Sequence, residues 1–271
     1  MLRPIVNSTW LRDHRDEVVI ADVRWSLTGP SGRERYLREH IAGAVFVDLD
    51  TQLADIGDPR DGRHPLPSPE AFASAMGSLG IGNADHVVAY DDAGGLFAAR
   101  LVWMLRAIGH GAALLDCGLA TWDGPLEAGP GHARQPAVFT PRPWPPGRLA
   151  SIDEAADPAG MLIDVRARAR YRGDIEPVDP RAGHIPGAIN VPADEHLGDG
   201  ALLAAATLRA QFAAAGVTSA DDVIVSCGSG VNACYSLLVM EHVGLGQGRL
   251  FPGSFSAWSN RPERPVATAA D

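Results

Sequence analysis

The chain has 271 residues, of which 46% are hydrophobic and 21% charged, as in an ordinary soluble globular protein. Its formal net charge of −10 argues against a nucleic-acid partner, because phosphate binding requires a basic face. The sequence contains no apolar run long enough to span a membrane and no apolar signal core near its first residue, so we expect a cytoplasmic protein with no membrane attachment.

Short apolar runs alternate with helical patterns along the whole chain. In the first half, residues 18–23 and 87–90 predict buried parallel strands, and residues 69–79 and 99–108 predict helices. In the second half, residues 161–165 and 223–226 predict strands, and residues 201–215 and 231–243 predict helices. This alternation predicts an α/β fold in which helices cover both faces of a parallel sheet.

Four short motifs occur twice, in the same order. The pairs are residues 19–24 with 161–166, 40–44 with 184–188, 87–91 with 223–227, and 119–122 with 255–258. Such self-similarity indicates two copies of one domain. We place the first domain at residues 1–124 and the second at residues 149–271. The proline-rich residues 125–148 between them predict a stiff, extended linker.

Cys227 directly follows the predicted strand 223–226, at the edge where parallel sheets bind their ligands. Gly228 and Gly230 allow a tight turn whose backbone N–H groups point inward, and a predicted helix begins at Val231. This position favours the thiolate form of a cysteine and would stabilise an anionic sulfur. The alternative is a buried cysteine at a strand end, with glycines that serve only the turn.

Residues 227–231, Cys-Gly-Ser-Gly-Val, resemble the active-site loop of the 3-mercaptopyruvate sulfurtransferases, which belong to the tandem-domain rhodanese family. Residues 164–166 and 183–188 resemble signature segments of the rhodanese domain, and residues 100–110 resemble the helix of the family's first domain. The resemblance covers nearly the whole chain. It implies a non-catalytic first domain, in agreement with Asp91, which stands where Cys227 stands in the second copy.

The same resemblance implies the residues of the site. Cys227 would carry sulfur as a persulfide, and Ser229, His64 and Asp50 match a proton relay proposed for the family. The alternative is that Ser229 only caps the helix and that the other two are loop residues. The expected substrate-binding residues are Arg170, Arg181, Gly228, Gly230, Val231 and Asn232.

At two of these assignments the sequence departs from the family pattern. Arg172 competes with Arg170, because the loop before Arg181 is longer than the family pattern, and Asn232 stands where the family usually has threonine. Cys117 and Cys234 are expected to be structural, as are His40 and His184, which occupy equivalent places in the two copies.

The expected reaction moves sulfur from 3-mercaptopyruvate to cyanide or to a thiol acceptor such as thioredoxin or a small dithiol. No metal or organic cofactor is implied, and we expect a monomer. The cysteine loop has no basic side chain of its own, which favours mercaptopyruvate over the dianion thiosulfate.

Three alternatives stay open. A thiosulfate:cyanide sulfurtransferase is the nearest. A non-enzymatic persulfide-binding module is the next, although binding or regulatory copies usually lose the cysteine, whereas this chain keeps Cys227 in one copy. A cysteine phosphatase needs an arginine six residues after its cysteine, and this chain has Ala233 there.

Overall fold

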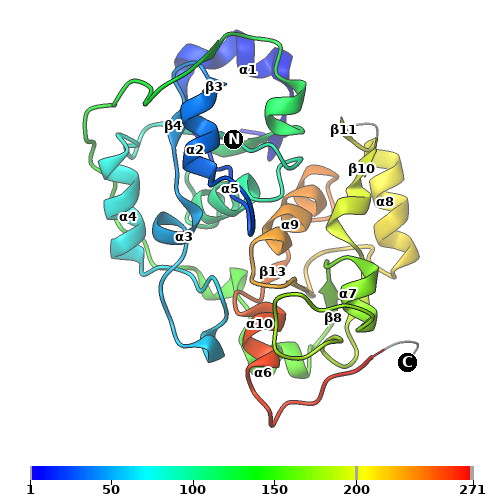
Figure 1. The fold of residues 1–271 in the computed structure, drawn as a ribbon. Coiled ribbons are helices and arrows are strands. Elements are labelled where there is room, and N and C mark those ends of the chain that lie inside the picture. The colour runs from blue at the N-terminus through cyan, green and yellow to red at the C-terminus, as the bar shows by residue number, and fades with distance from the viewer. Residues whose placement is uncertain (1, 199–200, 269–271) are drawn as a thin grey trace. The chain divides into compact units, whose positions relative to one another are not determined.

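A computed structural model describes residues 2–198 and 201–268 of the protein. The chain divides into two compact units, each with its own sheet and helices (Figure 1). The first unit is built mainly from residues before 145 and the second mainly from residues after it. Residues Ile56–Leu66 are an exception, because they group with the second unit although they precede much of the first.

The first unit contains a five-stranded sheet in which all neighbouring strands are parallel. Its order is β1 (Ile5–Val6), β6 (Ala112–Leu115), β5 (His86–Tyr90), β2 (Val18–Asp22) and β4 (Val45–Phe46). The helices of this part of the chain are α1 (Ser8–His14), α2 (Gly32–Arg38), α3 (Leu49–Gln52), α4 (Pro69–Ser78) and α5 (Ala98–Ala107). A separate antiparallel pair joins β3 (His40–Ile41) to β7 (Leu126–Glu127), so the beginning of the proline-rich segment pairs with the first unit.

The second unit contains a four-stranded parallel sheet. Its order is β13 (Arg249–Leu250), β12 (Val223–Ser226), β8 (Met161–Asp164) and β9 (Ile189–Asn190). The helices are α6 (Ile152–Ala156), α7 (Arg168–Arg172), α8 (Ala205–Ala214), α9 (Asn232–His242) and α10 (Ser254–Ser259). The predicted α/β class, with two copies of a parallel sheet flanked by helices, is therefore confirmed.

The remaining elements are short. They are the strands β10 (Leu197–Gly198) and β11 (Ala201–Leu202) and the 3-10 helices η1 (Arg15–Glu17), η2 (Pro59–Asp61), η3 (Gly118–Thr121), η4 (Pro146–Arg148) and η5 (Ala193–His196). No helix within residues 2–198 and 201–268 is both long and apolar enough to cross a membrane.

The four predicted strands and four predicted helices are all present, but one helix begins later than expected. The sequence predicted a helix over residues 201–215, whereas Ala201–Leu202 form β11 and α8 begins at Ala205. The start was misplaced because the N-cap of α8 is Ala204, which has no side chain that can bond the first turn. An alanine-rich stretch carries no local signal for where its helix starts.

Matching side-chain contacts confirm that the two halves are copies of one scaffold. Arg24 forms a buried, two-pronged ion pair with Asp22, and Arg166 forms the same pair with Asp164. In each copy a histidine ring stacks on a tyrosine 3.8 Å away and hydrogen-bonds the carbonyl of that tyrosine. These histidines are His40 and His184, and their matching contacts support the expectation that both are structural.

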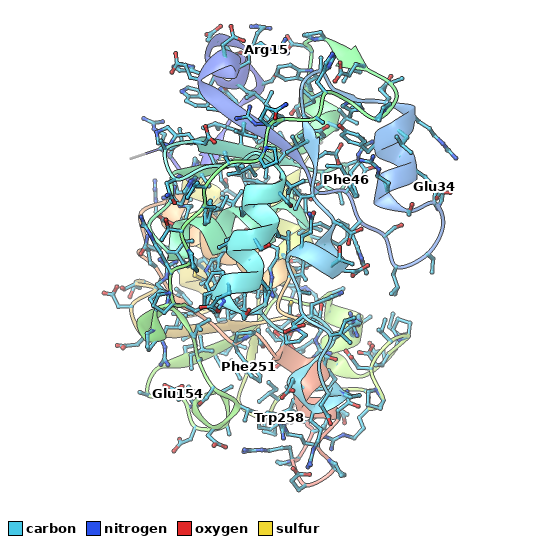
Figure 2. All side chains as sticks on the ribbon, turned by 90° about the vertical axis from the view of Figure 1, so that its left-hand side faces the viewer. Arg15, Glu34, Phe46, Glu154, Phe251 and Trp258 are labelled. Atoms are coloured by element: carbon cyan, nitrogen blue, oxygen red, sulfur yellow. The ribbon has the colours of Figure 1, made fainter. Side chains whose placement is uncertain are left out.

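Each unit has an apolar core that fixes the strand ends. Phe46 packs against the core of the first unit, whereas Phe251 and Trp258 belong to the core of the second (Figure 2). The strand β12 is buried along its whole length, so the residue that follows Ser226 is held by a rigid neighbour. That residue is Cys227.

Candidate active site

The cysteine loop, residues 227–231, joins the buried strand β12 to the helix α9. The thiol of Cys227 is buried, and its Sγ accepts a hydrogen bond of 3.1 Å from the N–H of Gly230. Gly230 has a φ of +76°, and a β-carbon there would lie 2.3 Å from the carbonyl oxygen of Pro252. Only glycine fits this position, which explains why the loop can curl around the sulfur.

The first residues of α10 form hydrogen bonds with the backbone of the cysteine loop. The N–H of Cys227 donates to Oγ of Ser254 at 3.0 Å, and the carbonyl of Cys227 accepts from the N–H of Phe255 at 3.0 Å. The carbonyl of Gly228 accepts from the N–H of Ser256 at 2.8 Å. The backbone of Cys227, the expected nucleophile, is therefore anchored at both its N–H and its carbonyl group.

Several backbone donors of the cysteine loop are unused. Within the described part of the chain, the N–H groups of Gly228, Ser229 and Val231 have no hydrogen-bond partner, although all three residues are buried. Buried N–H groups are almost always paired in folded proteins. A row of unpaired ones beside a thiol is the arrangement that an anionic sulfur or an anionic substrate would complete.

The first copy shows the same cradle already filled. Asp91, which takes the place of Cys227, is fully buried, and its carboxylate accepts four backbone hydrogen bonds of 2.7–2.8 Å. The donors are the N–H groups of Ala93, Gly95, Phe97 and Ala98. The first copy thus fills its own cradle with a carboxyl group, whereas the second leaves its donors open.

His64 lies in the second unit and meets the serine of the cysteine loop. Its Nδ1 is 2.8 Å from Oγ of Ser229, and both side chains are buried. Asp50, the third residue of the expected relay, lies on α3 of the first unit, where both carboxylate oxygens accept the indole N–H of Trp25 at 2.9 Å. Of the three expected relay residues, the structure therefore brings Ser229 and His64 into direct contact.

The two expected substrate-binding arginines have different surroundings. Arg170 borders the cysteine loop, because a β-carbon built on Gly228 would lie 3.4 Å from its Nη1. Its Nε and Nη2 are held by Glu176 at 3.2 and 2.6 Å. Burial alone raises the pKa of Glu176, but hydrogen bonds from Arg170 and from backbone N–H groups outweigh it and leave this pKa below its ordinary value.

Arg181 is committed elsewhere. Four of its donors reach backbone carbonyls at 2.7–2.9 Å. These carbonyls belong to Trp258, Ser259, Arg261 and Arg264, at and beyond the end of α10. The role that the resemblance implied for Arg181, direct contact with the substrate, does not match this geometry, because a guanidinium has only five N–H groups. Arg172, the competing residue, is half-exposed and pairs with Asp174.

The other expected loop residues lie where the helix begins. Val231 is buried just before α9, and Asn232 is the first residue of that helix. The two remaining cysteines are also placed. Cys234 is buried in α9 and its Sγ donates to the carbonyl of Gly230, as expected for a packed thiol. Burial raises the pKa of Cys117 to about 12, and the neighbouring Asp116 adds to the effect, so this thiol stays protonated near neutral pH.

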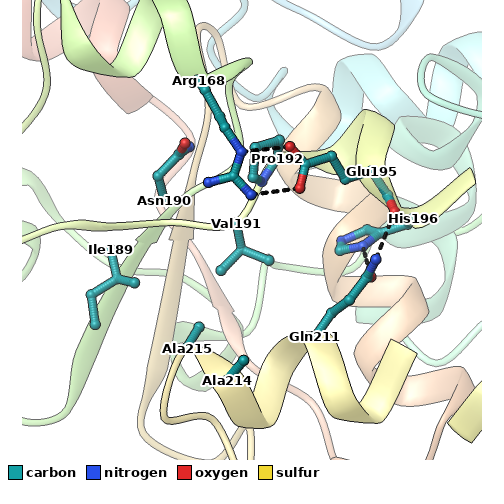
Figure 3. Close-up of a pocket in the computed structure, with 10 residues that line it drawn as sticks. All are labelled: Arg168, Ile189, Asn190, Val191, Pro192, Glu195, His196, Gln211, Ala214 and Ala215. Atoms are coloured by element: carbon teal, nitrogen blue, oxygen red, sulfur yellow. Dashed lines mark hydrogen bonds and ion pairs between the residues drawn. The ribbon is translucent and has the colours of Figure 1, made fainter. Parts of the chain in front are cut away.

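A pocket of about 330 Å³ in the second unit is a different feature (Figure 3). It contains none of residues 227–232, and its polar side chains mostly bond one another. Arg168 pairs with Glu195 at 2.6 Å, and the buried His196 contacts Gln211 and Ser236 at 3.2 Å. Burial lowers the pKa of His196, which favours its neutral form. The pocket therefore offers no nucleophile and no unpaired cation.

Sequence reasoning missed four residues that shape the site: Arg63, Glu176, Asp179 and Ser254. A β-carbon on Gly228 would lie 3.3 Å from Nη2 of Arg63, which also pairs with the buried Asp179 at 3.0 Å. The only available signal for Arg63 was its position directly before His64. Ser254 carried no signal, since it follows an ordinary Pro-Gly turn pair.

Comparison with known proteins supports this assignment of the fold. The model of the rhodanese-like domain matches residues 7–124 and 147–261. The chain is 40% identical over 259 residues to a Mycobacterium tuberculosis protein named as a thiosulfate sulfurtransferase, SseB, covering 93% of this chain and 91% of the relative. It is 37% identical over 281 residues to the 3-mercaptopyruvate sulfurtransferase of Escherichia coli K12, covering 96% of each.

Solved structures agree. The 3-mercaptopyruvate sulfurtransferase of Leishmania major superimposes with a TM-score of 0.88 at 30% sequence identity, covering 97% of this chain and 76% of that one. For SseA of Escherichia coli, the TM-score is 0.81 at 35% identity, covering 93% of this chain and 98% of that one. The chain therefore belongs to the rhodanese family and is a sulfurtransferase with two tandem rhodanese domains, related to both the 3-mercaptopyruvate and the thiosulfate sulfurtransferases.

Proposed function

We propose that this sulfurtransferase takes sulfur from 3-mercaptopyruvate and holds it as a persulfide on Cys227. The observation that carries the choice of donor is the 2.8 Å contact between Ser229 and His64. Loss of sulfur from mercaptopyruvate leaves an enolate that must be protonated, whereas loss of sulfur from thiosulfate leaves sulfite, which needs no proton. A hydroxyl bonded to an imidazole, both beside the nucleophile, suits the first reaction.

The first half-reaction forms one S–S bond and breaks one C–S bond. The thiolate of Cys227 attacks the sulfur of mercaptopyruvate, and the electron pair of the C–S bond passes to carbon as the pyruvate enolate. The proton of the donor's thiol balances the charge, since it ends on that carbon to give pyruvate. Ser229 and His64, which contact each other, would carry this proton, and the unpaired N–H groups of Gly228, Ser229 and Val231 would stabilise the persulfide anion.

The second half-reaction returns the enzyme to its starting state. A thiolate of the acceptor, a small dithiol or a thioredoxin-like protein, attacks the outer sulfur, and Cys227 leaves as a thiolate. Cyanide can replace the thiol and yields thiocyanate. Because the donor product departs before the acceptor reacts, the kinetics are ping-pong.

We assign supporting roles to three further residues. Arg170 holds the carboxylate of the donor through Nη1, the nitrogen that faces Gly228. Arg181 acts indirectly, by tying together the carbonyls at the end of α10, the helix that anchors the cysteine loop. Asp50 takes the third place in the relay by its match to the family pattern.

Thiosulfate is the second candidate donor, and one feature of the site favours it. The cysteine loop lacks basic side chains, but Arg63 and Arg170 bring two guanidinium groups to Gly228 from elsewhere in the second unit. A compact dianion would gain from both. The relative from Mycobacterium tuberculosis is named for this donor.

Steady-state assays with both donors and cyanide as common acceptor decide between them. We expect kcat/KM for mercaptopyruvate to exceed that for thiosulfate by at least about tenfold, or about 1.4 kcal/mol in barrier. Ser229→Ala should lower the mercaptopyruvate value by at least about tenfold, and change the thiosulfate value by less than about threefold, because only the first reaction needs the proton.

The cysteine variants supply the control. Cys227→Ser should abolish turnover with either donor, whereas Cys234→Ser should keep most of it. A preference for thiosulfate, or an equal effect of Ser229→Ala on both donors, would refute mercaptopyruvate as the preferred donor and leave the sulfurtransferase assignment intact.

A further inference from the structure

Two arginine side chains converge on one residue of the cysteine loop. Nη2 of Arg63 and Nη1 of Arg170 would lie 3.3 and 3.4 Å from a β-carbon built on Gly228. Both nitrogens therefore border the same face of the backbone, one residue from the nucleophile. The two arginines come from distant parts of the sequence, but both belong to the second unit.

Two buried carboxylates bind this arginine pair through nitrogens other than the two named above. Oδ1 of Asp179 accepts from Nη1 of Arg63 at 3.0 Å, and Oδ2 of the same carboxylate accepts from Nη2 of Arg170 at 3.1 Å. Glu176 binds the Nε and Nη2 side of Arg170. The side chains of Asp179 and Glu176 are only 1% and 3% exposed, so these contacts are fixed by packing.

The nitrogens that face Gly228 are not used by the two carboxylates. Among the residues that the structure describes, Nη2 of Arg63 and Nη1 of Arg170 have no hydrogen-bond partner. The carboxylates thus orient each guanidinium and leave one donor edge of each directed at the same place. Adjacent to that place lie the unpaired N–H groups of Gly228 and Ser229.

We propose that Arg63 is a donor-binding residue, which together with Arg170 grips the anionic oxygens of the sulfur donor. This inference rests on the proposed function and adds the second cation that Arg181, bound to four carbonyls, does not provide. The chemistry recognised is a planar or tetrahedral oxyanion, either the carboxylate of mercaptopyruvate or the oxygens of thiosulfate.

The charges of the two arginines and the two carboxylates predict that the direction of the N–H groups, more than net charge, determines how the donor is bound. Arg63 and Arg170 are balanced by Glu176 and Asp179, so the four side chains sum to zero. An arriving oxyanion is then attracted by two oriented N–H edges rather than by excess positive charge. Lysine presents a single ammonium and cannot bond Asp179 and the donor with the same fixed fork.

The test compares Arg63→Gln and Arg63→Lys with the matched control Arg60→Gln. Arg60 lies in the same segment and carries the same charge, but it pairs at the exposed surface with Glu263. We expect Arg63→Gln to raise KM by at least about tenfold for each donor that the wild type uses, with kcat changed by less than about threefold. Arg63→Lys should recover only part of the loss, and Arg60→Gln should match the wild type.

Urea unfolding of each variant checks that the fold survives. If Arg63→Gln is unfolded, the folded Arg63→Lys variant decides by the same KM criterion. A KM within about twofold of wild type for both donors, or a loss confined to kcat, overturns the role of Arg63. If the wild type uses only thiosulfate, the proposed donor fails while Arg63 is still tested on thiosulfate, so the two failures are distinguishable.

Discussion

Three thiols of one chain differ because of what surrounds each of them. Cys117 is kept protonated by burial and by Asp116, and the S–H of Cys234 donates a hydrogen bond to the carbonyl of Gly230. Cys227 is also buried, but its sulfur accepts a backbone hydrogen bond and its neighbours offer further unpaired N–H groups. Of the three, Cys227 is the thiol beside donors that an added sulfur or an anionic substrate could pair, which supports its proposed role as the nucleophile.

Ser254 is a second residue whose conformation is tied to the site. Its φ is +49°, a left-handed value that is costly for any residue except glycine. In the first copy the equivalent position is Gly118, with a φ of +59°. The serine is explained by its hydroxyl, which accepts the N–H of Cys227 and donates to the carbonyl of Phe251 at 2.8 Å.

Substitutions at Ser254 separate the strain from the hydrogen bond. Ser254→Ala and Ser254→Gly both leave the N–H of Cys227 unpaired, at a cost of about 1–3 kcal/mol. Alanine also keeps the left-handed strain, so Ser254→Ala should be less stable than Ser254→Gly by about 1 kcal/mol. Urea unfolding measures the difference. Equal stability of the two variants would show that the backbone of Ser254 is not strained.

At the scale of elements, the short segment Ile56–Leu66 matters more than its length suggests. It contains η2, Arg63 and His64, and it groups with the second unit. Gly62 seats it there, because a β-carbon on this residue would lie 2.7 Å from the carbonyl oxygen of Gly253, just before α10. The φ of Gly62 is +97°, which also favours glycine.

Gly62→Ala should therefore displace the segment and lower kcat/KM by at least about tenfold, through the loss of His64 and Arg63 from the site. Gly43→Ala is the matched control, because Gly43 has a φ of +83° but open space around it. This control should lose about 1 kcal/mol of stability and keep its activity. Comparable activity in the two variants would mean that the close contact of Gly62 with Gly253 has no effect on catalysis.

For the whole molecule, the two copies share a set of side-chain contacts but differ in the loop that carries Asp91 or Cys227. The ion pairs Asp22–Arg24 and Asp164–Arg166 are the same in both copies, as are the stacked histidines. The loops after β5 and β12 differ in length, since α5 begins seven residues after Asp91 and α9 begins five residues after Cys227. Asp91 fills the longer loop with its own carboxylate.

We therefore expect one active cysteine loop in the whole chain, even when a second cysteine is introduced. Asp91→Cys should gain one sulfur atom per chain on treatment with donor, carried on the peptide of Cys227, as in the wild type. The four N–H groups of the longer loop meet carboxylate oxygens, which lie one bond farther from the backbone than a cysteine sulfur would, and all four lose this partner. The variant should consequently unfold at lower urea concentration.

Mass spectrometry of the intact protein and of its peptides counts the sulfur. Cys227→Ser, the control, should gain none. A gain of two sulfur atoms in Asp91→Cys would show that the first copy retains a working cradle.

The sequence by itself determined the features that depend on local pattern and on repetition. Buried strands such as Val223–Ser226 follow from apolar runs, the glycines around Cys227 predict a tight turn, and the motifs shared by the two halves predict the tandem fold. Each of these signals lies within a few residues of the feature that it predicts. The start of α8 was predicted too early because this helix has no capping side chain, so no such local signal marks its first residue.

Only the tertiary structure decided which distant side chains serve the cysteine loop. It seats Ile56–Leu66 in the second unit, which brings Arg63 and His64 to Gly228 and Ser229. It also commits Arg181 to backbone carbonyls, whereas motif position alone had marked it for the substrate. A guanidinium binds whichever acceptors packing places around it, and those acceptors are set by contacts between segments far apart in the chain.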